Sequence, residues 1–299
     1  MPHLGRRHWS TAAAAAVAVL AAPAAAQAAT YTVATGNGPC AAPADIACGS
    51  LAEAAAAATA GDVFNVAPGT YDAATFAAPA VTITGAPGVA INGTMTFSGN
   101  APGLPSKLEK VAISQPVGNA PGIYVSGTAG LQLLDAAVVS ANGDGIIITG
   151  GTGNTIIRTL VGTGGQVTSA VRVTSTAGTP PKGLLLESSM LTGGGAGLSA
   201  NTVNNAVQAG AGDIAITAHH LTAAGSTNGI SLDSSTAQSL LAGPVGNIIA
   251  DVADSIALNN KTKRYAVLAP NEAVINATRT IQAADPNTLF ADAAGRNFR

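Results

Sequence analysis

Short stretches in which apolar and polar residues alternate are the strongest pattern in this chain. Six segments share one form: an apolar residue, a variable one, an apolar or small one, and then a polar turn residue. They occupy residues 123–126, 146–149, 171–174, 198–201, 230–233 and 256–259, and their starts are 23, 25, 27, 32 and 26 residues apart. Glycine precedes four of them, at positions 122, 145, 197 and 229. Apolar residues at every second position predict short half-buried strands, one for each repeat.

Two further apolar series accompany the first. The second runs through Val111/Ile113, Leu131/Leu133, Ile157, Leu184/Leu186, Ile214/Ile216 and Ile249, and the fainter third through Val139, Leu191 and Leu221. Three short strands in each repeat of about 25 residues predict an all-β parallel β-helix of roughly nine coils, a solenoid in which like residues stack. A leucine-rich horseshoe would need shorter, more regular repeats, and a two-sheet sandwich would not explain the columns.

The first part of the chain has a different pattern. Residues 50–53 have the form of a capping box, an alanine-rich run continues to Ala60, and Gly61 supplies a helix stop. A strand at residues 62–66 and a Pro-Gly turn follow. We therefore divide the chain into a signal peptide (1–28), an N-terminal cap with one short helix (29–61) and a β-helix domain (62–299).

Residues 1–28 are typical of a secretion signal. Arg6 and Arg7 precede a short apolar stretch, and Ala26-Gln27-Ala28 offers a cleavage site before Ala29. The apolar stretch is short and mostly alanine, whereas a membrane anchor needs about 20 strongly apolar residues. The mature chain is therefore expected to be secreted or at the cell surface, without a membrane span.

Composition excludes some classes of function. Charged residues make up 9% of the chain and aromatic residues 3%. Without Arg6 and Arg7, 11 of the 13 basic side chains remain against 15 acidic ones, a net charge of about −4. No basic surface for nucleic acid is expected.

The two cysteines, Cys40 and Cys48, both lie in the predicted cap. In an oxidising compartment a local disulfide is the expected state. A two-cysteine metal site is the alternative, but no histidine lies nearby in the sequence.

Two stretches, Cys48-Gly-Ser-Leu-Ala-Glu-Ala and Ala60-Gly-Asp-Val-Phe-Asn-Val-Ala-Pro-Gly-Thr-Tyr71, carry a resemblance to a known group. They are similar to the helix and first coil of the pectate-lyase-like superfamily of secreted right-handed parallel β-helix proteins. Residues 285–299 resemble the closing segment of that group. The resemblance implies a right-handed β-helix and export, but this fold carries lyases, hydrolases and adhesins, so it does not imply one activity.

The acidic residues do not form a recognisable catalytic group. In lyases of this fold, acidic residues hold calcium and an Arg or Lys removes a proton, whereas the acids of this chain are scattered along it. No paired aspartates of the kind used in glycoside hydrolysis stand out. We therefore expect no catalytic residue, no metal site and no cofactor. Calcium enters only if the chain is a lyase.

Tyr124 and Arg172 are the candidate ligand-binding residues, because the repeat places them in one outward column with Ile147 between them. Two other sets are weaker candidates. Arg158 and Glu187 are expected to share an outward column as a surface ion pair, and His219 is expected to point inward with His220 outward.

The leading hypothesis is a non-catalytic exported protein that binds extracellular polysaccharide or presents a surface of the cell envelope. One alternative is a lyase or hydrolase acting on uronate-containing glycans through an unrecognised site. Another is a purely structural envelope protein.

Overall fold

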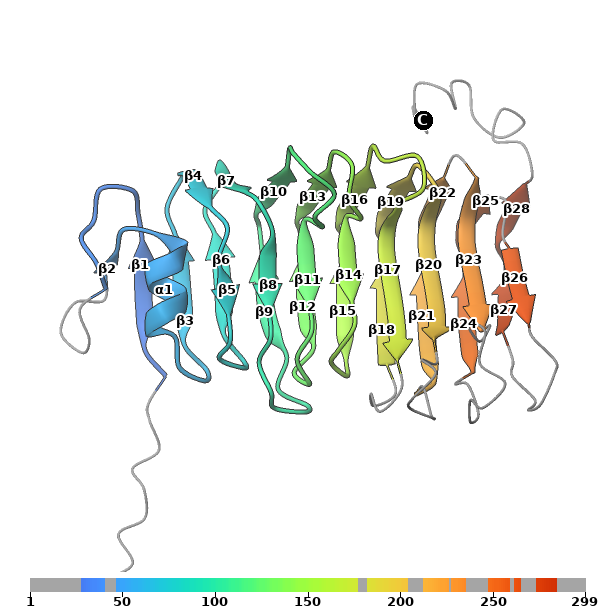
Figure 1. The fold of residues 1–299 in the computed structure, drawn as a ribbon, viewed down its shortest axis with the longest axis horizontal. Coiled ribbons are helices and arrows are strands. Elements are labelled where there is room, and N and C mark those ends of the chain that lie inside the picture. The colour runs from blue at the N-terminus through green and yellow to red at the C-terminus, as the bar shows by residue number, and fades with distance from the viewer. Residues whose placement is uncertain are drawn as a thin grey trace, which may run out of the picture.

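Short strands that wind around a common interior make up most of this chain. The computed structural model describes residues 28–40, 47–176, 182–203, 212–225, 227–234, 247–258, 261–264 and 273–283. Their strands form three parallel sheets, which we call A, B and C (Figure 1). The predicted signal peptide, apart from Ala28, and the predicted closing segment 285–299 lie outside the described residues.

Each sheet runs the length of the solenoid, and its strands follow one another in space as follows. Sheet A contains β2 (Ala47–Cys48), β1 (Thr30–Val33), β3 (Val63–Val66), β6 (Thr82–Gly85), β9 (Ser106–Glu109), β12 (Leu131–Leu134), β15 (Asn154–Ile157), β18 (Lys182–Glu187), β21 (Ile214–His219), β24 (Ile248–Ala253) and β27 (Ala273–Thr278). Sheet B contains β4 (Gly69–Asp72), β7 (Val89–Asn92), β10 (Ala112–Gln115), β13 (Ala137–Ser140), β16 (Leu160–Thr163), β19 (Met190–Gly193), β22 (Thr222–Gly225), β25 (Ile256–Leu258) and β28 (Ile281–Ala283). Sheet C contains β5 (Thr75–Phe76), β8 (Met95–Phe97), β11 (Ile123–Val125), β14 (Ile146–Ile148), β17 (Ser169–Thr176), β20 (Ala196–Val203), β23 (Asn228–Ser234) and β26 (Lys261–Arg264).

From β3 onward the chain visits sheets A, B and C in turn, and each strand pairs in parallel with the third strand after it. The strands β3 to β26 make eight complete coils, and the described part of the ninth consists of β27 and β28. Figure 1 shows the coils side by side along the long axis of the molecule. The fold is a right-handed parallel β-helix with three strands in each coil, as predicted.

Sheet C confirms five of the six repeated segments. Their first residues stack in register on successive strands, in the order Ile123, Ile146, Val171, Leu198 and Ile230. The sixth assignment was wrong, because residues 256–258 form β25 of sheet B. The sheet C strand of that coil is β26, whose sequence Lys-Thr-Lys-Arg contains no apolar residue to mark it.

A single corner residue with a left-handed backbone joins sheet A to sheet B in seven coils. These residues have φ between 47° and 56°, and the backbone N–H of each of the first six donates to a carbonyl of the next coil. The corner column consists of Lys110, Asp135, Arg158, Ser188, His220, Asp254 and Arg279. Because the corner interrupts the alternation of the strands, residues cannot be counted across it as though they lay on one strand.

Some residues of the second and third apolar series were assigned to the wrong sheet or to the wrong side of a strand because of this corner. Val111 and Ile113 follow the corner on the sheet B side, and Leu108 of β9 is the inward residue of sheet A in that coil. On sheet B, Val138 rather than Val139 stacks in register toward Leu191, and Val139 is 46% exposed.

The interior is filled by apolar side chains of all three sheets. At the N-terminal end the rings of Tyr31, Phe64, Phe76 and Phe97 form a row with centroids 4.9 to 6.0 Å apart, in which Phe64 meets Phe76 edge to face and the other two contacts are stacked. Further along, the buried residues are mostly Val, Ile, Leu and Ala. Although the chain has few aromatic residues, these four rings lie together and give the first coils a large apolar core.

The first coil is covered by α1 (Leu51–Ala57) and by β1 and β2. The Ser50 hydroxyl accepts a hydrogen bond from the Glu53 backbone N–H at 3.2 Å, and the Glu53 carboxylate accepts one from Gly49 N–H at 2.9 Å. The Ser50 half of the capping box is therefore confirmed, whereas the Glu53 carboxylate bonds to the residue before the N-cap. The helix ends at Ala57, three residues earlier than expected, because Thr59 bonds instead to the buried Asp62 carboxylate.

Cys40 and Cys48 form the predicted disulfide, which joins β2 to a residue eight positions earlier in the chain. Across the described ranges, no helix is long and apolar enough to cross a membrane.

Candidate binding face

The outer face of sheet C carries two parallel rows of side chains that follow the axis of the solenoid. We call the first row the ridge; it runs through Thr96, Tyr124, Ile147, Arg172, Ser199 and Ser231. The second row continues the same register two residues later, through Ser98, Ser126, Thr149, Thr174, Asn201 and Asp233. Side chains of both rows are half-buried or exposed, as expected for the outward positions of a sheet.

The structure brings the two predicted binding residues into one column. Tyr124 pairs with Ile147, and Ile147 pairs with Arg172, so an aromatic ring, an aliphatic side chain and a guanidinium occupy successive coils. The Tyr124 hydroxyl lies 3.3 Å from the Thr149 hydroxyl of the second row. The two rows are thus linked at this point.

Arg172 has a partner that the repeat pattern did not predict. Its guanidinium lies 3.1 Å from a carboxylate oxygen of Asp144, whose side chain is only 6% exposed, against 37% for Arg172. The same oxygen accepts a hydrogen bond from Ser169 N–H at 2.7 Å. Asp144 lies in the connection before β14, so sequence spacing along the strands could not indicate it. It fixes Arg172 and cancels its charge.

Five further charged residues lie at the corner column. Arg158 makes two hydrogen bonds to the Asp135 carboxylate, at 2.6 and 2.8 Å, and Arg279 makes two to Asp254, at 2.5 and 2.7 Å. These hydrogen bonds hold the pKa of Asp135 and that of Asp254 below the ordinary value for an aspartate. Both pairs are exposed, so each contributes little to stability.

Two predictions about charged and titratable residues were wrong. Arg158 does not share a column with Glu187; it lies at a corner, and Glu187 pairs with Ile157 because Ile156, not Ile157, is the inward residue of β15. His219 is exposed on sheet A and does not point inward, because the corner residue that follows it breaks the alternation. That corner residue is His220, which is exposed as expected.

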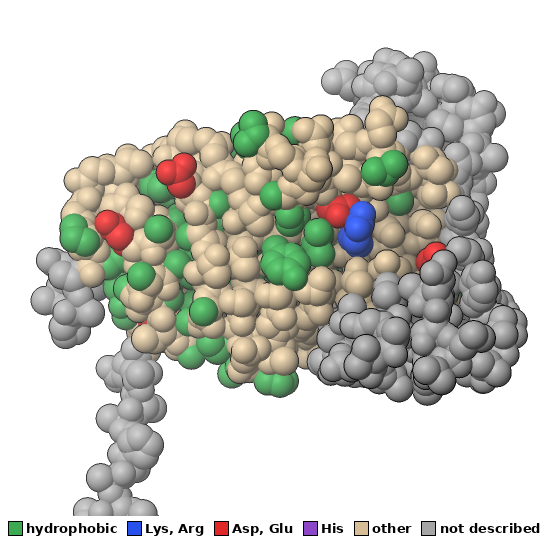
Figure 2. Space-filling view, viewed as in Figure 1, with side chains coloured by type: hydrophobic (Ala, Val, Ile, Leu, Met, Phe, Trp, Pro, Cys, Tyr) green, Lys and Arg blue, Asp and Glu red, His purple; other side chains and the backbone are tan. Residues whose placement is uncertain are grey.

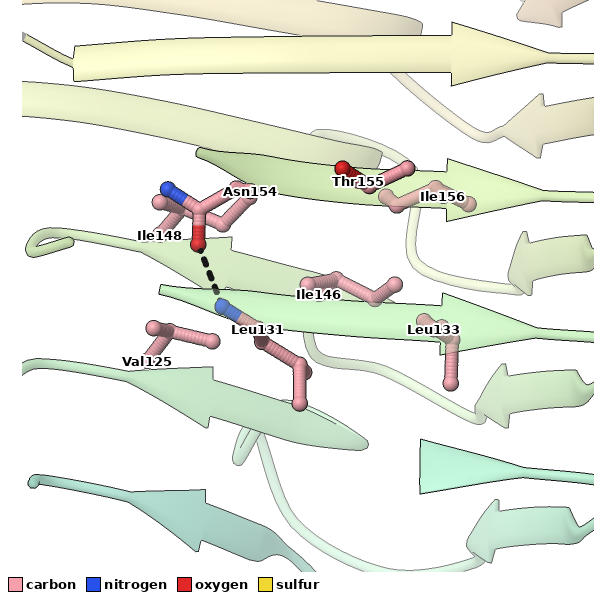
Figure 3. Close-up of a pocket in the computed structure, with 8 residues that line it drawn as sticks. All are labelled: Val125, Leu131, Leu133, Ile146, Ile148, Asn154, Thr155 and Ile156. Atoms are coloured by element: carbon pink, nitrogen blue, oxygen red, sulfur yellow. Dashed lines mark hydrogen bonds between the residues drawn. The ribbon is translucent and has the colours of Figure 1, made fainter. Parts of the chain in front are cut away.

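One small void lies in the interior of the described solenoid. This void of about 10 Å³ lies between sheets A and C, lined by Val125, Leu131, Leu133, Ile146, Ile148, Asn154, Thr155 and Ile156 (Figure 3). Asn154 holds the wall together by accepting a hydrogen bond from Leu131 N–H at 3.0 Å. A space of this size is at the lower limit for one water molecule, so it cannot hold a substrate.

The described residues contain no group of three or more His, Cys, Asp and Glu side chains arranged to hold a metal ion. Charged side chains are few on the face seen in Figure 2, where one Lys or Arg lies against an acidic side chain and most of the described surface is backbone or uncharged polar side chain. The site that the structure offers is therefore an open, flat and nearly uncharged surface.

The fold defines a class, the right-handed parallel β-helix proteins, as the resemblance of the first coil implied. Solved structures that are similar to this chain at low identity include two that follow. One is a pectin methylesterase from Aspergillus niger in deglycosylated form, with 11% identity, a TM-score of 0.41 and 86% of each chain covered. The other is ORF18 of Geobacillus virus E2, with 11% identity, a TM-score of 0.36, and 74% of this chain and 53% of that chain covered. No protein-family model and no curated protein matches the chain.

Proposed function

We propose that this chain is an exported, non-catalytic protein that binds extracellular polysaccharide along the outer face of sheet C. The observation that carries the proposal is the stacking of Tyr124, Ile147 and Arg172 in one register on successive coils. Coils of a parallel β-helix are about 4.8 Å apart. That spacing is close to the length of one sugar unit in an extended glycan, so a chain lying along the ridge would meet one side chain per unit.

Each residue of the ridge has a role suited to sugars. The Tyr124 ring offers a flat apolar surface with a hydroxyl at its edge, which suits the C–H face of a pyranose ring. Arg172 carries five N–H donors, more than its contact with Asp144 uses, and these suit sugar hydroxyls. The hydroxyl groups of Ser126, Thr149 and Thr174 lie alongside as further donors and acceptors.

The charge of this face favours an uncharged polysaccharide. From β8 to β20, Arg172 is the one charged residue among the ten outward positions of the two rows, and Asp144 pairs with it. An acidic polymer would have to compete with Asp144 for Arg172, and would leave a buried carboxylate without its cation. Neutral hydroxyls can bind the paired guanidinium without breaking the pair.

The pairing of charged side chains also supports a non-catalytic role. A general acid or base must be free to exchange a proton with substrate. Asp135, Asp254 and Glu109 each bond to an Arg or Lys instead, and the pKa of each is lowered by that bond. The proposal therefore includes no cofactor.

Export is supported by the predicted signal peptide and by the disulfide, because disulfides persist in oxidising compartments.

Binding to pairs of polymers that differ in charge tests the proposal. The pairs are hydroxyethylcellulose with carboxymethylcellulose, and methyl-esterified polygalacturonate with polygalacturonate, measured by affinity electrophoresis. Tyr124→Ala should weaken binding about tenfold. Leu160→Ala, an exposed apolar residue of sheet B, should leave binding unchanged.

Three results would contradict the proposal. Absence of binding across the panel would remove the polysaccharide role and leave the structural envelope role. If Tyr124→Ala and Leu160→Ala weakened polysaccharide binding equally, the ridge would not be the binding site. Release of unsaturated uronates in the presence of calcium, detected by absorbance, would make the chain a lyase.

A further inference from the structure

Asp62 is a fully buried carboxylate that joins the N-terminal cap to the first coil. One of its oxygens accepts a hydrogen bond from the backbone nitrogen of Ala29 at 2.7 Å. The other accepts bonds from the backbone N–H and the hydroxyl of Thr59, at 2.8 and 2.9 Å. The residue lies immediately before β3, so these bonds fix the start of the solenoid.

All three of these donors are neutral while residue 28 is attached. An anion withdrawn from water is costly unless a cation compensates it. Within the described ranges, no hydrogen bond or ion pair joins Asp62 to a Lys or Arg. Among the described residues, the Asp62 carboxylate therefore has hydrogen-bond donors on both oxygens but no cation to balance its negative charge.

Ala29 is also the residue expected to begin the mature chain. The Ala26-Gln27-Ala28 sequence has the small residues that a leader peptidase selects before its cleavage site. Hydrolysis of the Ala28–Ala29 bond consumes one water, leaves a carboxylate on Ala28 and frees the amino group of Ala29. At neutral pH that amino group takes up a proton and becomes an ammonium.

We propose that cleavage between Ala28 and Ala29 completes the fold, because the new α-ammonium of Ala29 forms an ion pair with the buried carboxylate of Asp62. The inference rests on the export part of the proposed function and not on polysaccharide binding. Its geometry is already in place, since the nitrogen that becomes the ammonium is the one that lies 2.7 Å from the carboxylate.

The sheet holds Ala29 in position independently of the leader. The Ala29 carbonyl accepts a hydrogen bond from Val63 N–H at 2.8 Å, and the next residue, Thr30, pairs with Val63 in sheet A. Ala28 is exposed whereas Ala29 is half-buried. Removal of the leader therefore exposes one side of the new ammonium to water for its remaining hydrogens, while the other side stays against Asp62.

The test compares four forms of the protein: the chain that begins at Ala29, the same chain acetylated at its N-terminus, a chain that begins at Gln27, and the exported chain as cells produce it. Mass spectrometry of the exported chain should show Ala29 as the first residue. Acetylation and the two-residue extension should each lower Tm by about 4 °C. These comparisons keep Asp62 and so do not depend on the folding of a variant.

Asp62→Asn supplies the matched control. In that background, acetylation and extension should no longer change Tm, whereas in Glu53→Gln, which alters the capping-box carboxylate, they should still lower it. Equal Tm values for the free and acetylated chains would overturn the ion pair. An exported chain that begins elsewhere would overturn the cleavage site, and a chain retained inside the cell with its leader would instead contradict export.

Discussion

Glycine at the corner between sheets B and C is required by the closeness of successive coils, and Gly145→Ala tests this. A Cβ atom at Gly145 would lie 2.5 Å from the carbonyl oxygen of Ala170 and 2.6 Å from Cγ1 of Val161. The Gly145 N–H donates to Ser169 O, and its carbonyl accepts from Ile123 N–H, both at 3.0 Å. The coil cannot move away from the added methyl group without stretching these bonds.

The size of the effect follows from these contacts. Overpacking of a core by one methyl group costs about 1–3 kcal/mol, and each weakened backbone bond adds about 1 kcal/mol. We expect Gly145→Ala to lower the free energy of unfolding by about 3–5 kcal/mol, and Tm by about 6–20 °C. Urea unfolding followed by circular dichroism measures the first quantity.

Gly183→Ala is the control for this prediction. A Cβ at Gly183 would lie 3.8 Å from its nearest neighbour, the backbone nitrogen of Gly153, so this substitution should change stability by less than about 0.5 kcal/mol. Equal unfolding midpoints for the two variants would show that coil spacing does not select glycine at position 145.

Three other predictions concern charge and the disulfide. Arg158→Gln should destabilise the chain at pH 7, and the difference in Tm from the unchanged chain should vanish as the pH falls below the ordinary carboxyl range near 4. The reason is that the hydrogen bonds from Arg158, which lower the pKa of Asp135, stabilise the fold only while that carboxylate is ionised. A difference in Tm that stayed constant with pH would contradict this reasoning. Asp144→Asn should raise the affinity for carboxymethylcellulose about threefold, because the charge of Arg172 is then no longer neutralised. Affinity electrophoresis measures this, and an unchanged affinity would contradict the prediction. Replacement of Cys40 and Cys48 by Ser should lower the free energy of unfolding in urea by about 2.5 kcal/mol, and reductant should have the same effect on the unchanged chain but none on the variant.

The column of Tyr124, Ile147 and Arg172 could be predicted from the sequence because it depends only on alternation within strands. Each residue is the second of its repeated segment, and the distances between segments equal one coil. The disulfide and the capping box were predictable for a similar reason, since both depend on residues close together in the chain.

Features that depend on corners or on connections between strands could not be predicted in this way. His219 was misplaced because the left-handed residue at position 220 changes which side of the chain faces inward. The partner of Arg172 lies 28 residues earlier in a connecting segment, and that of Asp62 lies 33 residues earlier. Strand periodicity contains no information about these contacts, because the bend of each connection decides them.

The corner column explains why an open face of this protein can remain nearly uncharged. A left-handed corner residue projects its side chain outside the sheets, where a charged group displaces nothing from the core. Five of the seven corner positions carry an Asp, Lys or Arg, and four of those five form two Arg–Asp pairs between neighbouring coils. The charge of these corner residues is thus placed at an edge, away from the ridge. Between β8 and β20, an acidic polymer would therefore find one cation on the two rows, Arg172, which is paired with Asp144, whereas a neutral glycan could lie along this part of sheet C without disturbing any of these pairs.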